Sequence, residues 1–248
     1  ESLPAIYTAL RGLNLAERTG ASPDLARLYA SMCLGLAFAP QRRLARVYAR
    51  LTREMIERVT EERARAWALE VLSLYHCGIG EWGDALEAAN AAVEIAKSVG
   101  DQRRMEEALV TPALVAHYRG DLERASSMWL DLYRLAADRR DPQVQAWCGT
   151  GYAETRLLLG EDERALHWLL RAQRLLVDTL DEINNASCYG GLTLAYCRLG
   201  FSDQISHVVD QMIPLLHRAP SAFSMLEGLA NFSEACLMLS ASESGVDG

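Results

Sequence analysis

A short pattern recurs along this chain at a fixed interval: a glycine is followed five residues later by an alanine. The first residue lies at 80, 120, 160 and 200 in successive copies, so the interval is 40 residues. The pairs are Pro40 and Ala45, Gly80 and Ala85, Gly120 and Ala125, Gly160 and Ala165, and Gly200 and Ile205. Repetition at this interval is typical of arrays of similar structural units. The pattern therefore marks a repeated unit, and not one active site.

Each unit is predicted to contain two helices, because its apolar residues recur at helical spacing, as in Leu166, Leu169 and Leu170. The first helices are expected over residues 23–38, 62–78, 102–118, 142–158 and 182–198. The second helices are expected over residues 42–58, 83–98, 122–138, 162–178 and 202–217. A helix over 4–20 precedes these pairs and one over 222–239 follows them, and each is half of a unit.

The predicted helix starts also repeat. Asp101, Asp141 and Asp181 are 40 residues apart, and Glu61 and Ser221 occupy the same position in other units. An N-cap side chain accepts hydrogen bonds from backbone N–H groups that the helix leaves unpaired. We therefore interpret these acidic residues as caps and not as catalytic groups.

Composition argues against nucleic acid and membrane as partners. The net charge is -8, whereas phosphate binding needs a concentrated basic surface. No apolar run approaches the roughly 18 residues of a membrane span. We expect no secretory signal, and the six cysteines form no CxxC pair, which favours reduced thiols in a cytoplasmic protein.

Motifs of the common enzyme classes are absent from the sequence: it has no phosphate loop, no His-Glu-x-x-His and no Gly-x-Ser-x-Gly. We expect no catalytic residue and no cofactor. Cys77, His117 and Cys197 share one position of the unit, but packed helices lie about 8–10 Å apart and zinc holds its ligands at roughly 2.0–2.3 Å. No metal site is expected. The helical glycines Gly149, Gly151, Gly190 and Gly191 are interpreted as points of close helix packing.

Two-helix units with glycine followed five residues later by alanine resemble the tetratricopeptide repeat (TPR), whose common unit has about 34 residues. Tyr196 matches the aromatic position of the family's first helix, although His76, Ala116 and Arg156 replace it elsewhere. The longer unit is similar to that of C-terminal sensor regions in large bacterial ATP-dependent regulators, such as maltose-type transcription activators and ATPase-linked nucleotide cyclases.

The resemblance implies an all-α, right-handed superhelix, an α-solenoid of about five helix pairs with a half-repeat at each end. The repeat domain is expected over 1–239, and a disordered tail over 240–248. The units are expected at residues 1–20, 21–60, 61–100, 101–140, 141–180, 181–220 and 221–239.

In the family, first helices line a concave groove that binds partners. Carried over by position, the groove candidates are Phe38, Trp67, Glu70, Leu74, His117, Tyr118, Trp147, Glu154 and Arg198. The alternative is that aromatic residues such as Trp67 and Trp147 belong to the core between helices.

A basic stripe, Arg43, Arg46, Arg50 and Arg53, follows one face of a second helix. It is either a solvated face balanced by nearby glutamates or a docking surface for an acidic module.

The sequence therefore predicts a non-catalytic repeat domain of a larger cytoplasmic regulator. It would sense signals by binding a peptide, a partner protein or another domain of its own chain in the groove. The alternative is a receptor for a small-molecule effector that switches an attached ATPase, cyclase or transcription-activator module. Open half-repeats at the ends would also allow two copies to pair as a homodimer.

Overall fold

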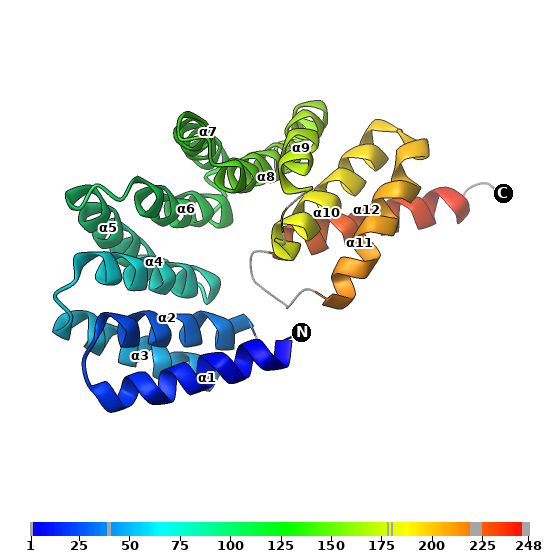
Figure 1. Cartoon of the computed structure of the whole chain (residues 1–248). Coiled ribbons are helices and arrows are strands. Elements are labelled where there is room, and N and C mark those ends of the chain that lie inside the picture. Colours follow the sequence, from blue (N-terminus) through cyan, green and yellow to red (C-terminus); the bar gives the residue numbers. More distant parts are fainter. Residues whose placement is uncertain (1, 39–40, 178, 180, 219–224, 245–248) are drawn as a thin grey trace. The chain divides into compact units, whose positions relative to one another are not determined.

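A computed structural model describes residues 2–38, 41–177, 179, 181–218 and 225–244 (Figure 1). Within these residues the chain is built from α-helices joined by short turns, without a β-strand. The first helices are α2 (Pro23–Phe38), α4 (Glu62–Gly78), α6 (Gln102–Tyr118), α8 (Pro142–Leu158) and α10 (Glu182–Leu199). The second helices are α3 (Arg42–Arg58), α5 (Trp82–Ser98), α7 (Leu122–Asp138), α9 (Asp162–Leu176) and α11 (Ser202–Arg218). The half-repeats are α1 (Ser2–Thr19) and α12 (Leu226–Ser244).

The repeating helix pairs confirm the predicted all-α solenoid, and α4, α6, α7 and α8 have the predicted bounds. The C-terminal end differs, because α12 continues to Ser244 and makes the first residues of the expected tail helical. Residues 245–248 and the expected cap Ser221 lie outside the described residues.

Turn glycines end several of the helices in the left-handed region, as at Gly120 (φ 78°) and Gly160 (φ 74°). This backbone conformation is readily available to glycine and costly for other residues. Gly20 and Gly100 adopt it at the end of the unit, where Arg140 (φ 58°) stands in place of glycine. Arg140 therefore holds a strained conformation that glycine adopts freely at Gly20 and Gly100.

The predicted caps are confirmed at the three aspartates. Asp101, Asp141 and Asp181 accept hydrogen bonds from the backbone N–H three residues later, at 3.1, 3.1 and 3.2 Å. The prediction was wrong for Glu61, whose side chain makes no capping bond. Its longer side chain instead accepts a hydrogen bond from Arg27 Nη2 at 2.6 Å.

The chain divides into two compact units, residues 1–115 and 116–248. The core of the first unit gathers Ala30, Cys33 and Leu72 around the repeat alanine Ala45. All six cysteines of the chain are free thiols. No helix among the described residues has the length and apolarity needed to cross a bilayer.

The core of the second unit is built around Leu169, Leu176 and Leu192, with residues from α8 to α12. The repeat alanines Ala125 and Ala165 are fully buried.

Glycines let helices of the second unit approach closely, as predicted. A Cβ on Gly151 would lie 2.6 Å from the Trp129 ring, and one on Gly191 would lie 3.0 Å from Leu169. One on Gly190 would lie 2.0 Å from the carbonyl oxygen of Gly228 in α12. The prediction was wrong for Gly149, which has ordinary space for a Cβ.

Candidate functional site

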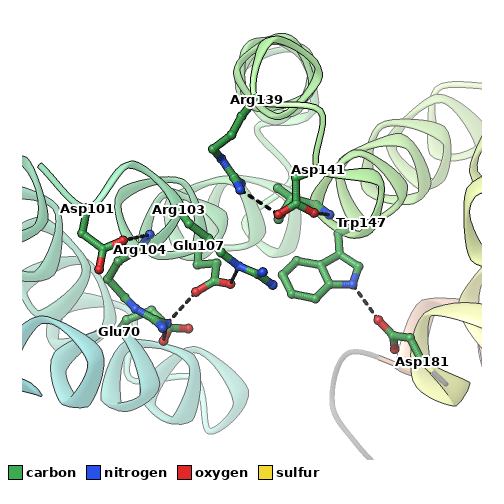
Figure 2. A network of polar contacts seen from close by, with 10 residues as sticks. Glu70, Asp101, Arg103, Arg104, Glu107, Arg139, Asp141, Trp147 and Asp181 are labelled. Carbon is green, nitrogen blue, oxygen red and sulfur yellow. Dashed lines mark hydrogen bonds and ion pairs between the residues drawn. The ribbon is translucent and has the colours of Figure 1, made fainter. Parts of the chain in front are cut away.

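The groove candidates lie on the first helices, and the structure shows which of them pair with neighbours. In the first unit, buried Glu70 of α4 accepts a hydrogen bond from Arg104 Nη1 of α6 at 2.8 Å (Figure 2). Arg104 also pairs with Glu107 at 2.5 Å, and Arg103 with Glu107 at 2.9 Å. Burial raises the pKa of the Glu70 carboxyl to about 7, although Arg104 acts to lower it. These charges tie α4 to α6.

Trp147 of α8 makes the corresponding tie in the second unit. Its indole Nε1 donates to Asp181 Oδ2 at 2.7 Å (Figure 2). Asp181 also caps α10. The indole is half-buried, so part of it faces solvent. Trp67 is also half-buried, and it packs on the core of the first unit beneath the Arg104 guanidinium, 6.0 Å from the ring centre. Both aromatic side chains thus share core and surface roles.

Two buried hydroxyl contacts join further pairs of first helices. Ser73 Oγ of α4 lies 2.8 Å from Thr111 Oγ1 of α6. In the second unit His117 Nδ1 lies 3.1 Å from Thr155 Oγ1 of α8. Each pair is separated by 38 residues. Such contacts fix the register of neighbouring helices, because a slip would leave buried polar atoms unpaired.

A second cluster forms around Glu154 of α8. Glu154 as a whole is half-buried, but its Oε1 atom is shielded from solvent and has no hydrogen-bond partner among the described residues. Burial, reinforced by the Glu227 carboxylate of α12, raises the pKa of Glu154 well above its usual value. Glu227 Oε1 also lies 3.3 Å from Nε2 of His117, a ring that is almost fully buried.

The remaining groove candidates are less available or less defined. Arg198 is occupied by the Leu157 carbonyl, Asp162 and Glu234, at 3.0, 3.0 and 2.6 Å. Leu74 and Tyr118 are half-buried, and the ring of Tyr118 stands edge-on to His117. Phe38 ends α2, but its side chain lies outside the described residues.

The arginines of the basic stripe all lie exposed on α3: Arg43, Arg46, Arg50 and Arg53. Arg50 approaches Glu54 at 3.8 Å, and Arg53 Nη2 lies 2.7 Å from His76 Nε2. Beside Arg53 is a cleft of about 370 Å³ between α3, α4 and α5. Residues that line this cleft include Arg53, Leu69, Leu72, His76, Asp84 and Glu87.

His76, Glu81 and Asp84 bring potential metal ligands within 4.8 Å of one another. However, His76 Nδ1 donates to Glu81 Oε2 at 2.7 Å when Nε2 accepts from Arg53. Burial, assisted by Arg53, lowers the pKa of His76 against the opposing effect of Glu81. Both ring nitrogens are engaged and a cation is already present, so we assign no metal here.

The sequence did not identify Arg104, Asp181 and Glu227 as site residues. Arg104 and Asp181 could have been found by searching for a hydrogen-bond donor and an acceptor 34 residues apart, as in Glu70 with Arg104 and Trp147 with Asp181. Comparison of equivalent positions, which are 40 apart, does not detect such pairs. Glu227 carries no comparable signal, because its partners lie on α6 and α8 and not on the preceding first helix.

No protein-family model matches this sequence. The search of curated proteins also finds no match.

Similar solved structures include a Rap protein complexed with competence and sporulation factor (TM-score 0.70, 16% identity, covering 95% of this chain and 69% of that one). Aspartyl phosphate phosphatase F from Bacillus subtilis has a TM-score of 0.68 at 16% identity, over 93% of this chain. BtubC from P. vanneervenii has a TM-score of 0.65 at 14% identity, over 86% of this chain and 89% of that one.

The chain spans only 61% of the phosphatase F structure. At these identities the similarity concerns the fold. The fold class is thus a TPR-like, all-α solenoid.

Proposed function

We propose that this chain is a protein-interaction module that binds a peptide or an extended partner segment against its first helices. The observation that carries the proposal is the arrangement around Trp147. Its indole is fixed by Asp181, yet it remains half-exposed on the first helix of its pair. Aromatic side chains held in place and partly open are effective anchors for a partner, because little conformational freedom is lost on binding.

Two further features support this proposal. Trp67 occupies on α4 the position equivalent to Trp147 and is also half-exposed, beside the Arg104 guanidinium, a charged group that can orient a peptide. One similar structure is a Rap protein in complex with competence and sporulation factor, so a solenoid of this kind can hold a separate factor. We propose that the module senses signals within a larger cytoplasmic regulator, with an ATP-dependent regulator as the candidate parent.

The test is selection of random peptides by display on the full chain, followed by affinity measurements. Changing Tyr118 and Trp147 together to Asp is expected to abolish binding while helical circular dichroism is retained. His167→Asp, an exposed change on α9, is the matched control and should bind as wild type does. Loss of helicity in the double variant would assign both residues to the core and contradict the groove assignment.

A small-molecule effector is the second candidate, supported by the cleft between α3, α4 and α5. Its volume of about 370 Å³ is within the range of ligand sites, roughly 300–1,000 Å³. A thermal-shift screen of sugars, nucleotides and amino acids tests it, since a ligand of the folded state raises the melting temperature. A hit that His76→Ala weakens supports the cleft, and no shift across the panel counts against it.

Pairing of two copies through the half-repeats is also proposed. Tyr7, Leu10 and Leu15 of α1 are 63%, 42% and 55% exposed, and Leu237 of α12 is 72% exposed. Light scattering of the full chain should show a dimer that Leu10→Glu dissociates. A monomer at all concentrations would refute it.

A further inference from the structure

The repeat itself does not require a glutamate at position 154. Equivalent positions in the other first helices are Leu34, Leu74, Leu114 and Leu194. Leu194 is almost fully buried, in keeping with an apolar role at this place in the unit. Glu154 therefore places a carboxyl group at a position where the other first helices have leucine. Its Oε1 has no hydrogen-bond partner among the described residues. Burial of an unpaired carboxyl is costly, so a role in stabilising the solenoid does not account for it.

Glu227, whose carboxylate acts on Glu154, faces a further acceptor on His117. Thr155 Oγ1 donates to the carbonyl of Gly151 at 2.8 Å, so it can only accept from His117 Nδ1–H. In the neutral ring His117 Nε2 is then an acceptor, directed at Glu227 Oε1 across 3.3 Å. Nε2 has no hydrogen-bond partner in the described part of the chain, although the imidazole is only 4% exposed. Once the Glu154 carboxyl has lost its proton, the three groups are all acceptors and no donor stands between them.

We propose that His117, Glu154 and Glu227 form a binding site for a primary ammonium group of a bound peptide. An ammonium carries three N–H donors and a positive charge, which match one imidazole nitrogen and two carboxylates. A metal ion fits less well, because among the described residues only His76, Glu81 and Asp84 bring three ligand atoms within 4.8 Å. Glu227 is 22% exposed and gives the cluster an edge toward solvent. The ammonium belongs to a lysine side chain or to the N-terminus of the peptide.

Binding should be coupled to proton release. The charged or titratable groups that act on Glu154 are Glu227 from α12 and Cys188 from α10, and His117 from α6 faces Glu227 in turn. Burial and Glu227 favour the neutral carboxyl in the free protein, and an ammonium favours the carboxylate. The bound amine therefore displaces a proton from Glu154 to solvent.

The first test does not depend on a peptide. The full chain is melted with n-butylammonium chloride and, as controls, with sodium chloride at equal ionic strength and with n-butanol. We expect n-butylammonium to raise the melting temperature of the wild type and of Glu163→Gln, an exposed charge change on α9. It should not do so for Glu154→Gln or Glu154→Leu. An equal rise in all four proteins, or no rise in the wild type, overturns the proposal.

The second test uses peptides selected for the proposed function, on which this inference rests. Removing the amine, by N-acetylation for a terminal group or by Lys→norleucine for a side chain, should weaken wild-type binding about tenfold or more. The same change should alter binding to Glu154→Gln less than about twofold. Calorimetry in buffers of different ionisation heat should show proton release for the wild type and none for this variant. Peptides that bind independently of any amine leave the proposed function standing and refute the ammonium site. If no peptide binds but n-butylammonium selectively stabilises the wild type, the peptide function fails and the site stands.

Discussion

We predict that Gly190→Ala destabilises the chain where α10 crosses α12. At this crossing the atoms beside Gly190 and Gly228 belong to the backbone of the facing helix, which cannot move aside as a side chain can. A Cβ on Gly190 would stand 2.0 Å from the carbonyl oxygen of Gly228 and 2.6 Å from its carbonyl carbon. A Cβ on Gly228 would stand 2.5 Å from the Cα of Ser187. Ordinary contacts begin near 3.4 Å, so in the first case the helices must separate by roughly 1.4 Å.

The expected loss for Gly190→Ala follows from two opposing terms. Forcing an extra carbon into a close-packed contact typically costs about 1–3 kcal/mol, and rigid backbone places this case at the upper end. Alanine is favoured over glycine in a helix by roughly 1 kcal/mol. The net destabilisation should therefore be about 2 kcal/mol.

Gly149→Ala is the matched control, since its Cβ would lie at an ordinary 3.5 Å from Ala172 Cβ. This substitution causes no steric overlap, so only the higher helix propensity of alanine acts, and the variant should be more stable than wild type by up to about 1 kcal/mol. Urea unfolding followed by circular dichroism measures both changes through the midpoint and slope. If Gly190→Ala were as stable as Gly149→Ala, the close α10–α12 contact would be refuted.

Two further changes test strain and burial. Arg140→Gly should stabilise the chain by about 1 kcal/mol in urea unfolding, because it relieves a left-handed conformation (φ 58°) that glycine adopts freely; equal or lower stability would contradict the strain. Glu70 has its pKa raised from 4.5 to about 7 on folding, so its contribution to stability is full below pH 4.5 and is lost as the pH rises to about 7. In Glu70→Gln the free energy of unfolding, measured with urea, should change less between pH 4.5 and about 7 than in the wild type. The exposed change Glu163→Gln should leave this pH dependence as it is in the wild type. If Glu70→Gln also left it unaltered, the raised pKa would be contradicted.

The sequence was sufficient to predict the helices because their boundaries depend on local signals. A turn glycine such as Gly160 and a cap such as Asp141 act within a few residues of their own position. The 40-residue interval then repeats these signals along the chain. This is why the bounds of α6 and α8 could be predicted to the residue.

The site was harder to predict because contacts between neighbouring first helices do not follow the interval of the repeat. Trp147 meets Asp181 at a separation of 34 residues, and His117 meets Thr155 at 38. The offset depends on how far one helix slides and tilts against the next, which the periodicity does not encode. Asp181 could thus be recognised as a cap but not as the partner of an indole. Glu227 lies farther from its partners in sequence, so no neighbouring-unit comparison reveals it.

The Ser73–Thr111 contact allows this cross-helix pairing to be tested with a directional prediction. Ser73 Oγ donates to the Glu70 carbonyl at 2.7 Å, so the 2.8 Å contact requires Thr111 Oγ1 to donate to Ser73. Ser73→Ala leaves a buried Thr111 hydroxyl without its acceptor and should cost about 1–3 kcal/mol. Thr111→Val removes the donor but leaves the bond from Ser73 to Glu70 intact, so it should cost less. In the double variant no hydroxyl remains unpaired, and it should be more stable than the sum of the single changes predicts. Urea unfolding of the four proteins measures this cycle, and a larger cost for Thr111→Val than for Ser73→Ala would contradict the assigned direction of the bond.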